Sequence, residues 1–285
     1  MELGLSSGPF RGYCLRELAR LCQDAGIRLL ELWDNDGYLA GTKEAPAETV
    51  RILADHGVSV KSVHAPFPAD SRVPMEGVRD YLKRYRRTCD KAAEYAASYV
   101  VVHPVAVEPE VPGIDDVVES MPFSLDVWSL HMEVAWKAGI QVAFENLPPS
   151  SGWPRGCLPQ DVVKIVSEVG GPGAGACLDI SHCFAVGQDP SSSVKALEGT
   201  IILGVHTSDG IRGTASDRHL PPGEGDADWP ATFRALDRVG FAGTVILEVK
   251  SPYLDSRLLR AMCDFLIQAE GGDLKRYSRN DLNGL

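Results

Sequence analysis

The 285-residue sequence has no apolar run that approaches the roughly 18 residues of a membrane-spanning helix, and its start, MELGLSSGPFRGYC, holds no apolar signal core. Basic residues are not in excess either, because 28 lysines and arginines stand against 39 aspartates and glutamates, giving a formal net charge of −11. This balance argues against a general nucleic-acid binder and against a membrane-surface binder. We therefore expect no membrane partner, disfavour a nucleic-acid partner, and expect a cytoplasmic protein.

Paired cysteines are also missing. The seven cysteines are an odd number, no CxxC pair occurs, and the residues are scattered along the chain as Cys14, Cys22, Cys89, Cys157, Cys177, Cys183 and Cys263. This pattern argues against a disulfide framework and against a thiolate zinc site, and it favours a reducing compartment. No GxGxxG motif follows the first apolar run, which disfavours an open dinucleotide-binding sheet.

The sequence does have apolar runs of strand length that alternate with stretches of helical periodicity. The predicted strands are residues 2–6, 29–34, 58–65, 99–104, 140–146, 175–181, 201–208 and 244–250. Helical periodicity covers residues 12–26, 78–98, 126–138, 160–169, 229–239 and 256–269. The fourth helix is expected to start near Pro122–Ser124, because Ser or Asp before an apolar run suits a helix cap. This alternation implies parallel pairing through right-handed crossovers, and eight units predict an α/β fold, the (β/α)8 or TIM barrel. An open doubly wound sheet is the alternative.

The chain shows no linker-like stretch that would divide it. We expect a single barrel domain over residues 1–270 and a polar C-terminal tail over residues 271–285. The tail could take part in a subunit contact, so a homo-oligomer is left open.

The third to the eighth predicted strands each carry a histidine or a carboxylate at or near their carboxyl end. In chain order, the polar residues at these ends and in the loops just after them are His64, His103, Glu145, Asp179, His182, His206, Asp217, His219 and Glu248. In a parallel barrel all strand carboxyl ends open on one face, which is where barrel active sites are built. We therefore expect these nine residues to converge in space.

Imidazoles and carboxylates gathered without cysteine form the ligand set of a divalent metal such as zinc, manganese, cobalt or iron, and carboxylate-rich sites also suit magnesium. A single histidine or glutamate at a strand end is more often structural. Nine such groups at the mouth of one barrel differ from a single structural residue, because without a cation the carboxylates would repel one another and shift one another's pKa values. The sequence thus predicts a metal site. Trp33 and Trp153, after the second and fifth predicted strands, could line a substrate pocket beside it.

Seven motifs together resemble the xylose isomerase-like barrels, a group that includes the sugar phosphate isomerase/epimerase family and the endonuclease IV family. They are VHAPF, VVVHP, AFEN, CLDISH, GVHTSD, DRHLPPGEGDADW and ILEVKS, and the resemblance covers nearly the whole chain. In the sugar enzymes of this group one divalent metal is held by Glu, Asp, His and Glu from strands five to eight. Here the resemblance implies Glu145, Asp179, His206 and Glu248 as ligands.

The same resemblance implies residues that bind substrate. The histidine three residues after the aspartate would be His182, and the arginine in the loop after the metal histidine would be Arg212 or Arg218. His64 is a further candidate for this role. Glu145 and Glu248 would be the catalytic acid and base. The implied activity is isomerisation or epimerisation of a sugar, sugar phosphate or polyol, by proton transfer through a metal-stabilised enediolate, with Mn, Mg, Co or Zn as cofactor.

Endonuclease IV carries nine ligands for three zinc ions, and the nine strand-end residues named above resemble that set one by one, so one to three ions are possible. Two departures favour the sugar enzymes. The first loop reads GLSSGPFRG instead of a histidine-containing segment, and the second strand continues as LLELWDNDG, whose Glu31 is typical of the sugar branch. A trinuclear phosphodiesterase acting on abasic DNA, a related dehydratase and a non-catalytic sugar-binding barrel remain the alternatives.

Overall fold

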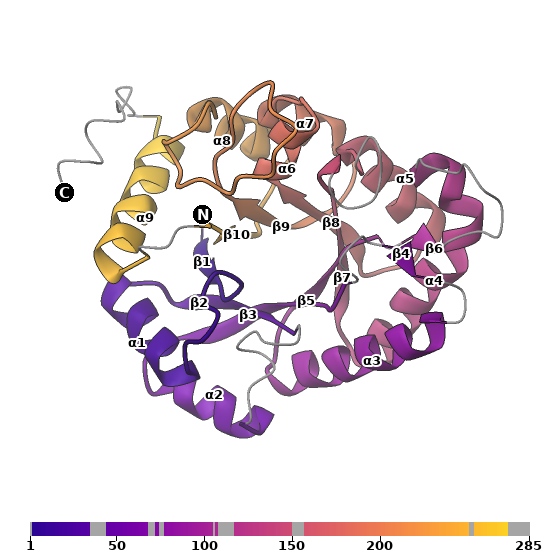
Figure 1. Ribbon diagram of the computed structural model, residues 1–285, viewed down its shortest axis with the longest axis horizontal. Helices are drawn as coiled ribbons and strands as arrows, with labels where there is room; N and C mark the ends of the chain where they lie inside the picture. Colours follow the sequence, from indigo (N-terminus) through magenta and orange to yellow (C-terminus); the bar gives the residue numbers. More distant parts are fainter. Residues whose placement is uncertain are drawn as a thin grey trace.

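The computed structural model describes residues 2–34, 44–67, 72–73, 77–104, 106–107, 117–149, 157–250 and 254–272. Eight parallel strands close into a barrel in the order β1-β10-β9-β8-β7-β5-β3-β2, and the helices form a ring around it (Figure 1). The predicted TIM barrel is confirmed, and the doubly wound alternative is wrong because the sheet has no open edge. No helix within the described ranges is long and apolar enough to cross a membrane.

Each barrel strand overlaps one predicted apolar run. The strands are β1 (Glu2–Ser6), β2 (Leu29–Trp33), β3 (Ser59–His64), β5 (Tyr99–Val102), β7 (Gln141–Glu145), β8 (Ala174–Asp179), β9 (Ile202–Thr207) and β10 (Thr244–Leu247). A separate parallel pair, β4 (Arg72–Val73) and β6 (Ala106–Val107), lies outside the barrel. Sequence reasoning missed this pair because two-residue strands show no periodicity.

The helices are α1 (Leu15–Ala25), α2 (Pro46–Ala54), α3 (Val78–Glu94), α4 (Val117–Lys137), α5 (Pro159–Val169), α6 (Ile180–Ala185), α7 (Pro190–Ala196), α8 (Trp229–Arg238) and α9 (Ser256–Glu270). The sequence did not predict α2, α6 and α7, which are too short for a 3.6-residue period to show. Helix α4 begins at Val117, before the expected start near Pro122–Ser124. The helix continues through Pro122, a residue that argues against a helix interior.

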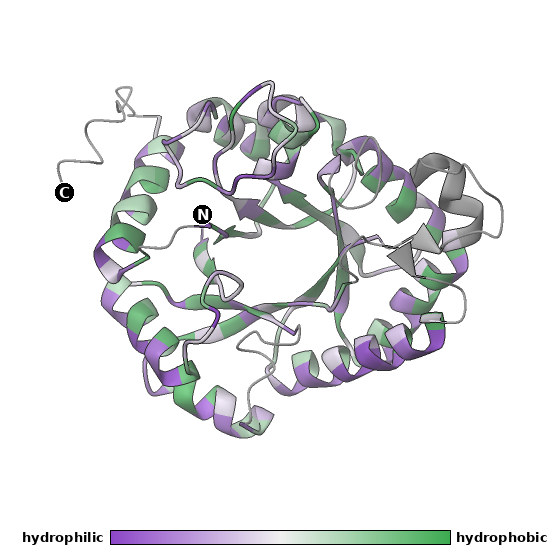
Figure 2. Cartoon of the chain, viewed as in Figure 1, coloured by the Kyte–Doolittle hydropathy of each residue, from purple (hydrophilic) through white to green (hydrophobic). Residues whose placement is uncertain are grey.

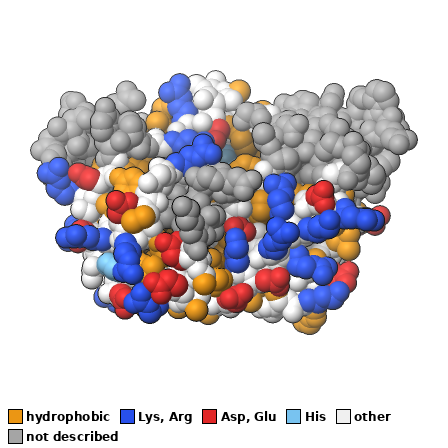
Figure 3. All heavy atoms as spheres, turned by 60° about the horizontal axis from the view of Figure 1, so that its bottom comes forward, with side chains coloured by type: hydrophobic (Ala, Val, Ile, Leu, Met, Phe, Trp, Pro, Cys, Tyr) orange, Lys and Arg blue, Asp and Glu red, His pale blue; other side chains and the backbone are white. Residues whose placement is uncertain are grey.

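The main core lies between the outer surface of the barrel and the surrounding helices. Figure 2 shows hydrophobic residues along the strands and hydrophilic residues on the outer sides of the helices. On α3, Tyr81, Tyr85 and Cys89 are buried at four-residue spacing, whereas the basic side chains of KRYRR (83–87) are exposed. Charges of both signs are interspersed on the face shown in Figure 3, so this basic run is a solvated helix surface.

Strand alternation aims the strand-end residues into the barrel. On β8, Ala176 and Leu178 join the core beneath the helices, whereas Cys177 belongs to a small cluster inside the barrel. Because side chains alternate along a strand, Asp179 points inward as well. An irregularity on the β8–β9 ladder then pairs Asp179 with His206. Neighbouring strands therefore deliver their polar ends to the same lumen.

Candidate metal centre at the barrel mouth

The carboxyl ends of neighbouring strands bring the potential ligands into one buried cluster. Four groups of three residues each offer ligand atoms that lie within 4.8 Å of one another. They are His64–His103–Glu145, Asp179–His182–His219, Glu145–Asp179–His206 and Glu31–His206–Glu248. Eight of the nine predicted strand-end residues belong to these groups, and Asp217 contacts His219 beside them. Glu31 joins the cluster although sequence reasoning gave it no role there.

His206 lies at the centre of the cluster, with three carboxylates around its Nδ1 atom. This atom is 3.0 Å from Oε1 of Glu145, 3.1 Å from Oε2 of Glu248 and 3.8 Å from Oδ2 of Asp179. Asp179 Oδ2 and Glu248 Oε2 are buried and have no hydrogen-bond partner in the described part of the chain. Buried carboxylate oxygens without partners are costly, and a divalent cation would satisfy them. These four residues therefore fit a metal ion.

The two glutamates of this centre differ in pKa. Burial alone would raise the pKa of Glu145, but His206, His103 and His64 hold it well below the usual range. Burial raises the pKa of Glu248, and the opposing effects of His206 and His219 do not cancel that rise. Two carboxyl groups with separated pKa values suit one proton acceptor and one proton donor.

A second group lies between β8 and the loop after β9. Nε2 of His219 is 2.9 Å from Oδ1 of Asp217, and Nδ1 of His219 donates to the carbonyl oxygen of Glu248 at 2.9 Å. Burial on its own would lower the pKa of His219, but the charges of Asp179 and Asp217 raise it to about 9. Nδ1 of His182 donates to the carbonyl oxygen of Asn146 at 2.7 Å, which leaves its Nε2 for a ligand or substrate.

A third group places two imidazoles on one carboxylate oxygen. Nε2 atoms of His64 and His103 each lie 3.2 Å from Oε2 of Glu145. Burial lowers the pKa of His103 to about 4, so this ring is neutral and can give a lone pair to a metal ion. Rings of Trp33 and Phe67 lie beside these histidines, with centroid distances of 4.7 Å from Trp33 to His64 and 4.1 Å from Phe67 to His103.

Asn146 joins the ends of β7 and β8. Its Oδ1 accepts from the backbone N–H of Asp179 at 2.7 Å, and its Nδ2 donates to the carbonyl oxygen of Asp179 at 3.0 Å. Asp179 in turn caps α6 by accepting from the backbone N–H of His182 at 2.8 Å. Sequence reasoning missed the role of Asn146, whose only signal is its place directly after Glu145.

Asp209 holds the loop that carries Asp217 and His219. Its carboxylate accepts hydrogen bonds from the backbone N–H groups of Gly210, Gly223 and Ala227 and from Nε1 of Trp229. The loop is further closed by paired backbone hydrogen bonds between Asp209 and Leu220. No spacing in the sequence signals these contacts, because they join residues up to 20 positions apart.

The structure does not bring every predicted site residue to the cluster. Nη2 of Arg212 pairs with Oδ2 of Asp189 at 3.0 Å, and Arg218 is exposed. Within the described ranges, no hydrogen bond or ion pair joins either arginine to the cluster. Trp153 lies outside the described residues, whereas Trp33 is half-buried next to His64.

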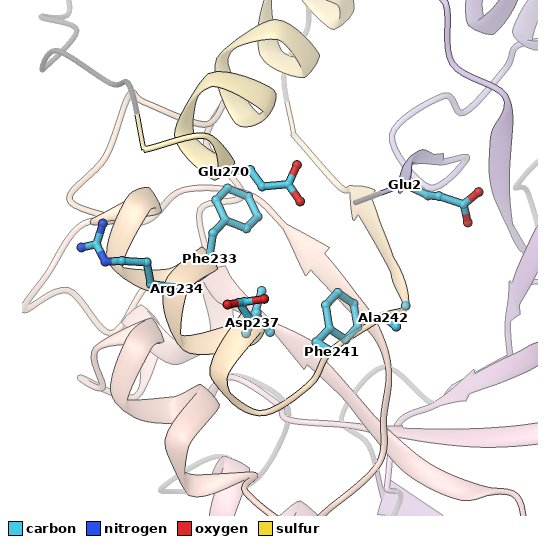
Figure 4. A pocket seen from close by; sticks show the side chains of 9 residues that line it. Glu2, Phe233, Arg234, Asp237, Phe241, Ala242 and Glu270 are labelled. Atoms are coloured by element: carbon cyan, nitrogen blue, oxygen red, sulfur yellow. The ribbon is translucent and has the colours of Figure 1, made fainter.

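A cavity of about 610 Å³ lies at the opposite, amino-terminal end of the barrel, next to the starts of β1 and β10 (Figure 4). Phe233 and Phe241 contribute its aromatic wall, and the carboxylates of Glu2, Asp237 and Glu270 stand around it. None of the described metal-ligand groups includes a residue of this cavity. Among the described residues, the potential metal ligands therefore gather at the mouth.

Two curated relatives share part of the sequence. An uncharacterized protein of Methanocaldococcus jannaschii is 30% identical over 193 residues, covering 66% of this chain and 64% of the relative. A "Probable endonuclease 4" of Mycobacterium leprae is 29% identical over 178 residues, covering 58% of this chain and 64% of the relative. The matched regions thus span less than two thirds of the length of each relative.

Solved structures share the whole fold. A D-tagatose 3-epimerase-like protein has a TM-score of 0.77 at 23% identity, covering 96% of this chain and 98% of that one. An IOLI protein with a bound zinc atom has a TM-score of 0.78 at 19% identity, covering 96% and 100%. The family description "Xylose isomerase-like TIM barrel" matches residues 19–269. The chain belongs to the xylose isomerase-like TIM barrel family.

Proposed function

We propose that the chain is a divalent-metal-dependent isomerase or epimerase of a small sugar, sugar phosphate or polyol. The observation that carries the proposal is the pair of carboxylates, Glu145 from β7 and Glu248 after β10, within 3.1 Å of the same Nδ1 atom of His206. The sugar-epimerase name of a structural neighbour and the zinc atom of another support it.

A metal ion bound by Glu145, Asp179, His206 and Glu248 would polarise a substrate carbonyl and stabilise negative charge on the adjacent oxygens. Glu145, whose pKa the surrounding histidines hold low, would be ionised and could accept the proton from the carbon next to the carbonyl. Glu248, whose pKa burial raises, could return a proton to carbon. Proton removal by one glutamate and return by the other gives epimerisation, whereas return to the neighbouring carbon gives aldose–ketose isomerisation.

Other residues of the mouth would bind and orient the substrate. Nε2 of His182 would accept a hydrogen bond from a substrate hydroxyl, because Nδ1 of the neutral ring carries the proton that it donates to the carbonyl oxygen of Asn146. This hydrogen bond would orient the substrate beside the metal site. The rings of Trp33 and Phe67 would cover the apolar face of a sugar and exclude water.

Solvent proton exchange tests the proposal directly. The metal-loaded chain is incubated with ketoses, aldoses and inososes in D2O, and deuterium at carbon is followed by NMR. Glu145→Gln and Glu248→Gln should each slow exchange by about 10²–10⁴-fold, the usual contribution of a positioned acid or base. Glu133→Gln, an exposed carboxylate on α4 paired with Lys137, is the matched control and should leave exchange unchanged. Near-normal exchange in both site variants would contradict the mechanism.

A second candidate is a trinuclear phosphodiesterase acting on abasic DNA. The observation in its favour is that the His64–His103–Glu145 and Asp179–His182–His219 groups lie beside the central one. The endonuclease name of a curated relative agrees with it. Nicking of an abasic oligonucleotide by the zinc-loaded chain, together with three zinc ions per chain, would place this function ahead of sugar isomerisation.

A further inference from the structure

We propose that Glu31 is a positioning residue that fixes the tautomer of His206, so that Nδ1 of His206 presents its lone pair to the metal. The inference rests on the proposed metal site and adds a residue that nothing above assigns to it. Glu31 is fully buried on β2, three strands away from β9 around the barrel. Its Oε1 nevertheless lies 3.0 Å from Nε2 of His206, so the contact crosses the lumen.

The two nitrogen atoms of the His206 ring differ in their surroundings. Three carboxylates lie within 3.8 Å of Nδ1, whereas Glu31 is the carboxylate that lies near Nε2 among the described residues. Cys177 also interacts with the ring. The 3.0 Å contact between Glu31 and His206 is not aligned as a hydrogen bond, and neither His206 Nε2 nor Glu31 Oε1 has a hydrogen-bond partner among the described residues. Nδ1 of His206, by contrast, is hydrogen-bonded to Oε1 of Glu145 at 3.0 Å. Because the carboxylates converge on Nδ1, a cation would bind at this nitrogen. Glu31, near Nε2, therefore contacts the metal ligand His206 and is not a metal ligand itself.

A neutral imidazole carries one ring proton, and its position decides which nitrogen can bind a metal. With the proton on Nδ1, the lone pair of Nε2 would face a carboxylate oxygen that has only lone pairs to offer, and the contact would be repulsive. With the proton on Nε2, the same contact is attractive and Nδ1 is left open. A carboxylate behind a ligating histidine commonly orients the ring in this way.

Ser62 fixes Glu31 in this position. Its Oγ donates to Oε2 of Glu31 at 2.7 Å, and both residues are fully buried. Ser62 and Glu31 are also direct partners on the β2–β3 ladder, so the backbone sets their separation. The hydroxyl therefore occupies one carboxylate oxygen and leaves the other for His206.

Metal affinity separates positioning from a purely structural role. Zinc dissociation constants are measured by competition with a chromophoric chelator for wild type, Glu31→Gln, Ser62→Ala and Asp34→Asn. Glu31→Gln, whose amide can turn an N–H toward Nε2, should weaken zinc binding by about 10–100-fold. Ser62→Ala should weaken it in the same direction but less. Asp34, at the end of the same strand and held by Thr88 and Lys91, is the matched control, and its variant should keep wild-type affinity.

Histidine ¹⁵N NMR of the zinc-loaded wild type gives a second readout that needs no variant at Glu31. It should show His206 protonated at Nε2. Wild-type zinc affinity in Glu31→Gln, or a proton on Nδ1, would overturn the inference while the metal site stands. A wild-type chain without zinc affinity would overturn the metal site and the inference together.

Discussion

Histidine side chains in the cluster can carry positive charge that compensates its carboxylates. Burial opposes a charge on His206, but Glu31, Glu145 and Glu248 raise its pKa well above the usual value. Burial likewise opposes charge on Asp217, yet His182, His219 and Lys250 lower its pKa. A metal must therefore displace protons from these imidazoles, since a ligating histidine is neutral.

The raised pKa of His219 predicts that the stability of the chain depends on pH. Its pKa is about 9 in the folded chain, against a usual value of 6.5. A raised pKa contributes stability that is fully present below pH 6.5 and is lost as the pH rises through 9. Urea unfolding of the metal-free chain should show the free energy of unfolding falling across this window, more steeply in wild type than in His219→Asn. Equal slopes in the two proteins would contradict the assignment.

Periodic patterns explain why the elements of the fold could be predicted. The apolar run of β8 and the four-residue spacing on α3 are local, so the sequence alone shows them. Contacts that join distant residues leave no such pattern. The Glu31–His206 contact crosses the barrel, and the Asp209 carboxylate closes a long loop, so neither could be predicted from spacing. The convergence of Glu145, Asp179 and Glu248 could be predicted because the carboxyl ends of parallel barrel strands open on one face.

The β9 strand provides a test of how closely the barrel interior is packed. A Cβ atom at Gly204 would overlap the hydroxyl of Tyr99. Gly204→Ala should therefore destabilise the chain by about 1–3 kcal/mol, the usual cost of overpacking. Tyr99→Phe should cost little, because within the described residues the Tyr99 hydroxyl has no hydrogen-bond partner. Combining the two changes should recover most of the loss in a urea-unfolding double-mutant cycle. Strictly additive losses would contradict this view of the interior.

The molecule as a whole carries a net negative charge, and its described residues gather potential metal ligands in a buried cluster at the barrel mouth. Proteins to which this chain is similar carry names as different as an epimerase-like protein and an endonuclease, so the fold alone does not select the reaction. The ligand groups make metal binding the common requirement of both candidate functions. The central claim is therefore that His206 and the carboxylates around it hold a divalent cation.

Elemental analysis of metal per chain tests this claim most directly, on wild type and Asp179→Asn purified without chelator or affinity metal. Asparagine can still cap α6, so the variant changes a carboxylate ligand while keeping the hydrogen bond to the N–H of His182. We predict at least one divalent ion per wild-type chain and its loss from the variant. A wild-type chain that takes up no ion even when divalent metals are supplied, or a variant that retains its full metal content, would contradict the account.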